Sequence, residues 1–259
     1  MAGPVIEGKR FWPFRWDELF DYQSYQVQEF IRGCGTPRVL ADKVIRAIEY
    51  PFYQGRPDDL HILNCYHGKW CRRIDLDFWQ KASETAAIGI GDCEDGTFLF
   101  VAGARAMGVP EDKVYATLGA VQDVRTGEII GYHAWAVIED PSFGDGWRYV
   151  ESTLDVPPKE YKPVEDIRKP YVSGVWRLIP EILGNDRRFE VIEPSLDVQA
   201  SMARFMAKRR KTRFVKVGYL EATFREKETR EKYRALEKIW GIRAKPLRRA
   251  GLLSRLRWR

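Results

Sequence analysis

Cys93 lies in the hexapeptide Gly-Asp-Cys-Glu-Asp-Gly of residues 91–96, directly before an apolar run over residues 97–107. The acidic residues are typical of a helix start, because their oxygens accept hydrogen bonds from the free N–H groups there and their charge complements the positive end of the helix dipole. The same dipole favours the thiolate form of Cys93, which is the nucleophilic form. Gly108 and Pro110 are typical of a helix end. The pattern predicts a rigidly held cysteine nucleophile at the N-terminus of a buried helix.

A histidine and a glutamate follow in two segments that are expected to pair. His133 lies in residues 128–139, where alternation of side chains predicts a strand. Residues 140–146 are rich in Pro, Ser, Gly and Asp and predict a hairpin loop, after which a strand over 147–153 carries Glu151. Counting back from the loop places Glu151 opposite His133 or one diagonal step away, on the same face. A carboxylate there raises the pKa of an imidazole and fixes the orientation of its ring.

These three residue types are the groups needed for nucleophilic acyl transfer. The thiolate attacks a carbonyl carbon, the imidazole transfers the proton, and the carboxylate orients the imidazole. His133 is the only histidine after the cysteine, so it has no rival downstream as general base. We therefore predict Cys93 as nucleophile, His133 as general base and acid, and Glu151 as the orienting group, with Asp155 as a second candidate for that last role.

Further helices and strands must hold these residues in place. Thr36 and Pro37 are typical of a helix start, and apolar residues then recur at helical spacing up to Tyr50. Residues 1–36 are rich in aromatic side chains and are expected to pack over the core, with a partner-binding arm as the alternative. The remaining predicted elements are helices over 17–30, 77–87 and 221–240 and strands over 114–121 and 172–179, with a linker over 183–194.

Two histidines and two cysteines lie close together in the loop-rich segment 51–75, namely His61, Cys65, His67 and Cys71. These residue types can bind zinc. Their spacing, His-x3-Cys-x-His-x3-Cys, is not one of the usual paired zinc knuckles. We therefore expect small buried cysteines and loop histidines, with a metal site as the alternative, and we predict no metal and no cofactor.

Charge is distributed unevenly along the chain. Residues 199–259 hold 20 of the 43 Lys and Arg residues but only 5 of the 37 Asp and Glu residues, which leaves 23 basic and 32 acidic residues in the rest. Aromatic residues are interleaved with the basic ones, as in segments that contact phosphates. The tail is expected to be a helical extension that packs on the acidic body. A tail that binds nucleic acid or an acidic partner is the alternative.

Composition also bears on the compartment. The chain has no apolar run long enough to span a membrane, and residues 1–10 lack the apolar segment of a signal peptide. Four cysteines in 259 residues do not make a disulfide scaffold. We therefore expect a cytoplasmic protein with reduced thiols and without a membrane partner.

Four segments in this order resemble the transglutaminase-like superfamily of papain-like cysteine enzymes. They are Gly-Asp-Cys-Glu-Asp at 91–95, the helix end at 105–110, the strand Gly-Tyr-His-Ala-Trp at 131–135, and residues 147–153. In that superfamily the last segment has a tryptophan and, four residues on, an acid that is usually part of Asp-Pro-Thr; here it is part of Glu-Ser-Thr. The resemblance covers about residues 37–180.

The resemblance implies an α+β fold in which the cysteine helix packs on an antiparallel sheet. It also implies chemistry on amides through a thioester, either hydrolysis or transfer to an amine. The oxyanion would be met by the backbone N–H of Cys93 and one further donor, for which Trp70 and Trp79 are candidates. Glutamate at 151 is one methylene longer than the usual aspartate, which is why Asp155 stays open. Calcium-regulated crosslinking of the animal transglutaminase type is not expected, because the chain lacks the length for the extra β-domains and a glycine-rich calcium loop.

Three regions follow from these patterns: an aromatic-rich extension over 1–36, a catalytic core over 37–182, and a linker with a basic helical extension over 183–259. The predicted function is thiol-dependent hydrolysis or acyl transfer on a protein or peptide amide. The alternative is a scaffold protein that has kept this fold while its basic tail over 199–259 binds nucleic acid or an acidic partner. The oligomeric state stays open.

Overall fold

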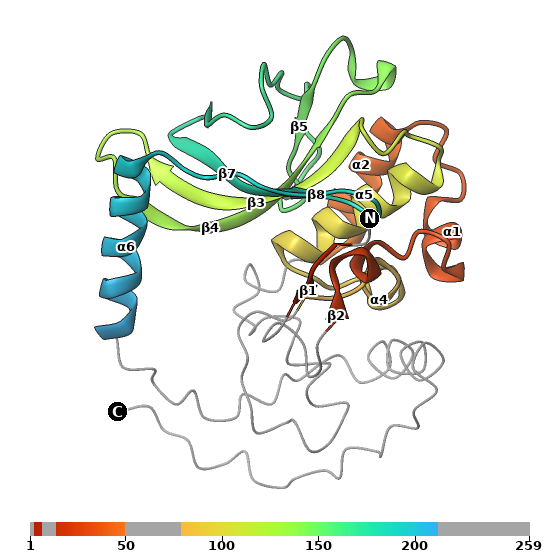
Figure 1. The fold of residues 1–259 in the computed structure, drawn as a ribbon. Helices are drawn as coiled ribbons and strands as arrows, with labels where there is room; N and C mark the ends of the chain where they lie inside the picture. Colours follow the sequence, from red (N-terminus) through yellow and green to blue (C-terminus); the bar gives the residue numbers. More distant parts are fainter. Residues whose placement is uncertain (1–2, 7–13, 50–78, 212–259) are drawn as a thin grey trace, which may run out of the picture.

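A computed structural model describes residues 3–6, 14–49 and 79–211 of the chain (Figure 1). The possible metal ligands between His61 and Cys71, the oxyanion candidate Trp70 and the helix predicted over 221–240 lie outside the described residues. So does most of the basic tail, and its binding role stays a prediction. The described residues form a mixed α+β fold in which helices gather on one face of a curled antiparallel sheet.

The main sheet has six strands, all paired antiparallel. The order is β5-β4-β3-β7-β6, and β8 pairs with β7. Its strands are β3 (Val114–Asp123), β4 (Ile129–Ile138), β5 (Arg148–Val150), β6 (Tyr171–Ser173), β7 (Trp176–Gly184) and β8 (Phe189–Val191). A separate pair joins β1 (Val5–Ile6) to β2 (Phe14–Arg15).

Two sequence predictions about the sheet are wrong. The single strand predicted over 172–179 is a hairpin, because Gly174 adopts a positive φ of 65° and turns β6 back into β7. The linker predicted over 183–194 is the end of β7 and the edge strand β8, which extend the sheet. The strand predicted over 147–153 is shorter than expected, since only residues 148–150 pair with β4.

Some of the described helices begin at predicted signals, whereas those over 141–143 and 196–211 were not predicted. The described helices are η1 (Trp16–Phe20), α1 (Tyr25–Ile31), α2 (Pro37–Ala47), α4 (Ala82–Ile88), α5 (Cys93–Ala106), η3 (Pro141–Phe143) and α6 (Leu196–Lys211). The predicted start of α2 is confirmed: Thr36 accepts a hydrogen bond from the Val39 N–H at 3.3 Å, and Pro37 is the first helical residue. The helix predicted over 17–30 is divided into η1 and α1.

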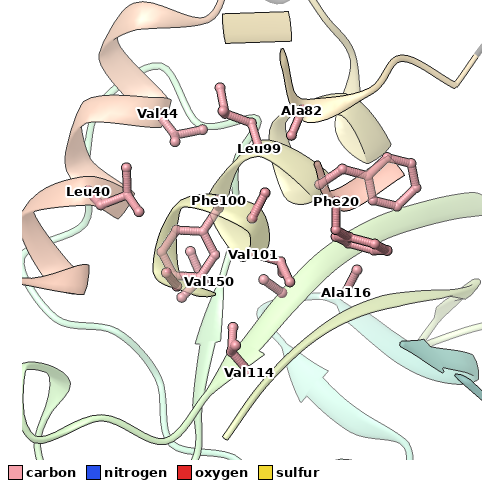
Figure 2. Close-up of a cluster of buried hydrophobic side chains, with 14 of the residues drawn as sticks. Phe20, Leu40, Val44, Ala82, Leu99, Phe100, Val101, Val114, Ala116 and Val150 are labelled. Atoms are coloured by element: carbon pink, nitrogen blue, oxygen red, sulfur yellow. The ribbon is translucent and has the colours of Figure 1, made fainter. Parts of the chain in front are cut away.

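Helix α5 is the centre of the fold. It packs against β3 and β4 on one side and against α1, α2 and α4 on the other, so every residue from Glu94 to Ala104 is buried. Figure 2 shows side chains of α5, among them Leu99 and Phe100, enclosed by residues of α2, α4 and the sheet. Aromatic residues of the N-terminal extension, Trp16 and Phe20 among them, belong to the same core, as predicted. A buried α5 therefore places Cys93 at a fixed point on the edge of the core.

The other face of the sheet is covered by residues of the long connection between β5 and β6. Val164 and Ile167 of this connection pack with Trp135 and Val137 of β4 in a second cluster of buried side chains. Helix α6 contacts the far end of the sheet, away from α5 (Figure 1). Among the described residues, no helix combines the length and the apolar character that crossing a membrane requires.

Candidate active site

Cys93 is the first residue of α5, as the sequence predicts. The helix start is held by Asp95, whose carboxylate accepts hydrogen bonds from the backbone N–H of Gln80 at 2.8 Å, from its side-chain amide at 2.8 Å, and from the backbone N–H of Asp92. Gly91 is required beside it, because a Cβ there would lie 2.6 Å from the Cβ of Asp95. The first turn of α5 is therefore anchored to the segment before α4, and the direction of the cysteine is set by this anchor.

The Cys93 thiol donates a hydrogen bond to Glu94 Oε2 at 3.2 Å. Burial raises the pKa of the thiol well above its usual value, and the carboxylates of Glu94 and Asp92 raise it further, whereas the backbone N–H of Ala134 acts in the opposite direction. The helix dipole alone predicts a lowered pKa, so this expectation is not met: burial and the adjacent acids outweigh the dipole. These influences favour the protonated thiol over the thiolate, which is the nucleophilic form.

His133 and Glu151 form the pair that the strand pattern predicts. Nε2 of His133 and Oε2 of Glu151 are 2.7 Å apart. Ala136 is paired with Val150, so extending the register by one residue places Glu151 opposite Trp135, one diagonal step from His133. The His133 ring also stacks on Trp135, with the ring centroids 6.2 Å apart. The imidazole is therefore held by a carboxylate at one nitrogen and by an aromatic ring on one face.

The Glu151 carboxylate is bonded on both oxygens. Oε1 accepts from the Thr153 N–H at 3.0 Å and from the Thr153 hydroxyl at 2.7 Å, while Oε2 accepts from the Tyr149 hydroxyl as well as from His133. Burial acts to raise the pKa of Glu151, but the neighbouring His133 and these hydrogen bonds outweigh it and lower the pKa to about 2. The group is a fixed anion at every physiological pH.

Ser152 joins the acid segment to the cysteine helix. Its hydroxyl donates to the Cys93 carbonyl at 3.3 Å and lies 3.4 Å from the Thr97 hydroxyl. Gly96 makes room for this contact, since a Cβ there would lie 2.9 Å from the Ser152 side chain. The segment after β5 therefore packs against the first turn of α5. Glu151 lies in the same segment and bonds His133.

The backbone of β4 reaches the cysteine from the other direction. Ala134, the residue after His133, directs its backbone N–H toward the Cys93 thiol. This N–H lies on the same side of β4 as that of Ala136, the last residue of β4 that pairs with β5. His133 and Glu151 thus come together from β4 and the segment after β5, and the Cys93 thiol of α5 meets the backbone of the residue that follows His133.

Two residues that the sequence offers as further candidates, one for the orienting acid and one for the second oxyanion donor, have other surroundings. Asp155 is exposed to solvent, and His133 is bonded to Glu151 instead. Trp79 belongs to the main core, where its ring meets the edges or faces of Phe14, Trp16 and Phe98. Among the described residues, Asp92, Cys93 and Glu94 are the one group whose ligand atoms lie close enough together for a metal ion.

Sequence reasoning missed the residues that support the site. Gln80, Tyr149, Ser152 and Thr153 each make contacts that hold Asp95, Glu151 or Cys93. For Tyr149 and Thr153 a signal was present, because strand alternation places both on the same face as Glu151. For Gln80 and Ser152 there was none, since their contacts depend on how separate elements pack.

The fold and the site together define a mixed α+β protein with a cysteine at a helix N-terminus and a histidine–carboxylate pair on the sheet against which that helix packs. A scan against protein-family models found no match, and a search of curated proteins found none either. Among solved structures, this chain is similar to LapG of Legionella pneumophila, with 15% identity over 71% of this chain and 83% of that chain and a TM-score of 0.38.

Two other structures of the same Legionella pneumophila protein give similar values. The EGTA-treated form is 18% identical over 72% of this chain and 97% of that chain, with a TM-score of 0.34. The calcium-bound form is 19% identical over 73% of this chain and 99% of that chain, with a TM-score of 0.33.

Proposed function

We propose that this protein is a thiol-dependent amide hydrolase or acyltransferase with a transglutaminase-like core, in which Cys93, His133 and Glu151 act as nucleophile, base and orienting acid. The observation that carries the proposal is the 2.7 Å bond between His133 and Glu151, formed on the strand whose next backbone N–H faces the Cys93 thiol. A buried carboxylate on one imidazole nitrogen fixes the tautomer and leaves the other nitrogen to exchange protons.

The reaction begins with transfer of the thiol proton. Nε2 of His133 is engaged with Glu151, so Nδ1 is the nitrogen that receives the proton from Cys93. The thiolate then attacks the amide carbonyl carbon, and the carbonyl oxygen becomes an oxyanion that the backbone N–H at the start of α5 can stabilise. Collapse of this intermediate breaks the C–N bond, and the imidazolium returns its proton to the leaving amine.

The thioester left on Cys93 is resolved by a second attack. Water, or an amine in a transfer reaction, gives its proton to His133 and adds to the thioester carbonyl. The carbon–sulfur bond then breaks, and the thiol regains its proton from the imidazolium. Glu151 keeps its negative charge throughout, because its low pKa prevents it from taking a proton.

Selective alkylation tests this proposal. Iodoacetamide is expected to label Cys93 faster than Cys34, Cys65 or Cys71 at neutral pH, because His133 is proposed to act as the base for Cys93. Replacement His133→Gln keeps the size of the side chain but removes the base, and we expect it to slow labelling of Cys93 alone by about tenfold or more. Peptide mapping by mass spectrometry gives the rate at each thiol. Equal rates at all four thiols would contradict the proposal.

A further inference from the structure

Tyr149 makes a hydrogen bond that the chemistry above does not require. Its hydroxyl donates to Oε2 of Glu151, the same oxygen that bonds His133. The Tyr149 backbone is held on both sides, by pairing with Val137 of β4 and by its N–H, which donates to the Lys162 carbonyl at 2.9 Å. Burial raises the pKa of Tyr149 well above its usual value, and the charge of Glu151 raises it further, so the hydroxyl stays a donor.

Together with the bonds from Thr153 and His133, this contact gives the Glu151 carboxylate as many hydrogen bonds as it can accept. A carboxylate has about four lone-pair sites. The Thr153 N–H and hydroxyl occupy those on Oε1, and Tyr149 and His133 occupy those on Oε2. Rotation of the carboxylate would break several of these bonds in a buried place, where a lost partner is costly. The carboxylate is therefore held in a single orientation.

A glutamate needs such support more than an aspartate does. Its carboxylate lies one torsion further from the backbone, so more orientations are open to it. Glu151 also lies beyond the last paired residue of β5, where strand pairing no longer fixes the backbone. We propose that Tyr149 and Thr153 are positioning residues that hold the Glu151 carboxylate toward His133 and so allow a glutamate to serve as the third member of the site. This inference rests on the proposed function only where it concerns catalysis.

The test compares two tyrosines that differ in one contact. Tyr171 packs its ring against that of Tyr149, with centroids 5.7 Å apart, and its buried hydroxyl has no hydrogen-bond partner among the described residues. Tyr149→Phe and Tyr171→Phe remove the same atom from the same aromatic cluster. Only Tyr149→Phe removes a bond to Glu151.

Carbon-13 NMR of the Glu151 carboxyl is the first readout, since it is independent of activity. We expect Tyr149→Phe to raise the midpoint of the Glu151 titration by about one unit or more and Tyr171→Phe to leave it unchanged. The rate of Cys93 alkylation at neutral pH is the second readout, and it should fall about tenfold in Tyr149→Phe alone. Thermal unfolding of both variants checks that they are folded.

Thr153 offers a second, independent route. Thr153→Val keeps the shape of the side chain but removes the hydroxyl, whereas Thr153→Ser keeps the hydroxyl. We expect the valine variant to shift the Glu151 titration upward and the serine variant to restore it. If neither Tyr149→Phe nor Thr153→Val moves the titration, the inference is wrong. If the titration moves but wild-type Cys93 is labelled no faster than the other thiols, the positioning role stands and the proposed function fails.

Discussion

The Cys93 thiol lies between two opposing influences. Its position at the start of α5 and the Ala134 N–H favour the thiolate, whereas burial, Glu94 and Asp92 favour the thiol, and the second group is stronger. A thiol that is protonated at rest is protected from oxidation and from adventitious electrophiles. It also makes the nucleophile dependent on a base, which is the role proposed for His133.

Removing the charge of Glu94 should activate the thiol. Glu94→Gln deletes the carboxylate that accepts the Cys93 hydrogen bond, so the pKa of the thiol is expected to fall and the alkylation rate at neutral pH to rise about tenfold. The pH dependence of iodoacetamide labelling measures both quantities. Glu111→Gln, at a carboxylate paired with Arg188, is the matched control and should change neither. A slower reaction in Glu94→Gln would instead identify Glu94 as a helpful base.

The central pair of the site could be predicted from sequence, whereas its surroundings could not. Strand alternation and one hairpin loop are enough to bring His133 and Glu151 to the same face, because the period of a strand is two residues. The position of Glu94 beside the thiol depends on side-chain torsions at the helix start. Those torsions leave no periodic trace in a sequence.

At the scale of elements, the site depends on the fit between α5 and the segment after β5. Gly96 belongs to α5, and the absence of its side chain lets Ser152 reach the Cys93 carbonyl. Strand pairing ends at Val150. Beyond it, the side chains of the next three residues form hydrogen bonds, where a continuing strand would form backbone hydrogen bonds. This departure from regular structure is what turns the acid toward the histidine.

A methyl group at position 96 should separate these two elements. The new Cβ of Gly96→Ala would lie 2.9 Å from the Ser152 side chain, so the acid segment has to move away from α5. We expect the alkylation rate of Cys93 to fall about tenfold, because misplacement of a supporting group by an ångström is costly to catalysis. Thermal unfolding should change little, since alanine favours a helix by roughly 1 kcal/mol over glycine and offsets the strain.

Gly103 of the same helix provides the control for Gly96→Ala. In Gly103→Ala the new Cβ would meet the end of the Leu40 side chain at 2.7 Å, in the core between α2 and α5, near the opposite end of α5 from Cys93. This variant should lose stability by about 1 to 3 kcal/mol and keep the alkylation rate of Cys93. The opposite pattern, in which Gly103→Ala alone slows labelling, would show that the site responds to core packing in general.

The elements that could be predicted are those with strong local signals. The start of α2 follows from Thr36 and Pro37, and the strands β3 and β4 follow from long alternating runs. Strand β8 could not be predicted because it has only three residues, and it follows a turn whose Gly-Asn-Asp sequence is typical of a loop. Its position is set by pairing with β7, which no local pattern reports.

At the scale of the whole molecule, buried carboxyl groups set the response to pH. Burial raises the pKa of Asp21 to about 6 and the pKa values of Asp95 and Glu181 to about 7. Each of these groups binds its proton more tightly in the folded state than in the unfolded state, so their contribution to stability falls as the pH rises from about 4 to about 7. Glu151 acts in the opposite sense, because its pKa is lowered to about 2.

These shifts predict a stability maximum in mild acid. Lowering the pH from about 8 to about 5 protonates the three carboxyl groups with raised pKa values and stabilises the fold. Below about pH 4 Glu151 takes up a proton in the unfolded state but stays ionised in the folded state. Its contribution of about 3 kcal/mol to the free energy of unfolding is therefore lost as the pH falls toward 2. Urea unfolding across this range measures the profile. A maximum at about pH 8 would show that the raised pKa values are wrong.

A substitution at Glu181 should remove one contribution to this dependence of stability on pH. Its side chain lies on β7 with Oε1 buried and without a hydrogen-bond partner among the described residues, so at neutral pH the fold holds a poorly solvated carboxylate there. Glu181→Gln removes the charge and should raise the free energy of unfolding at about pH 8 by about 1 to 2 kcal/mol, a value reduced for the partial exposure of the group. At about pH 4 the wild-type carboxyl is already protonated, so the two proteins should be equally stable.

Glu193→Gln, at an exposed position after β8, should change stability by the same small amount at both pH values. A Glu181→Gln variant whose advantage persists at about pH 4 would show that packing rather than charge is the cause.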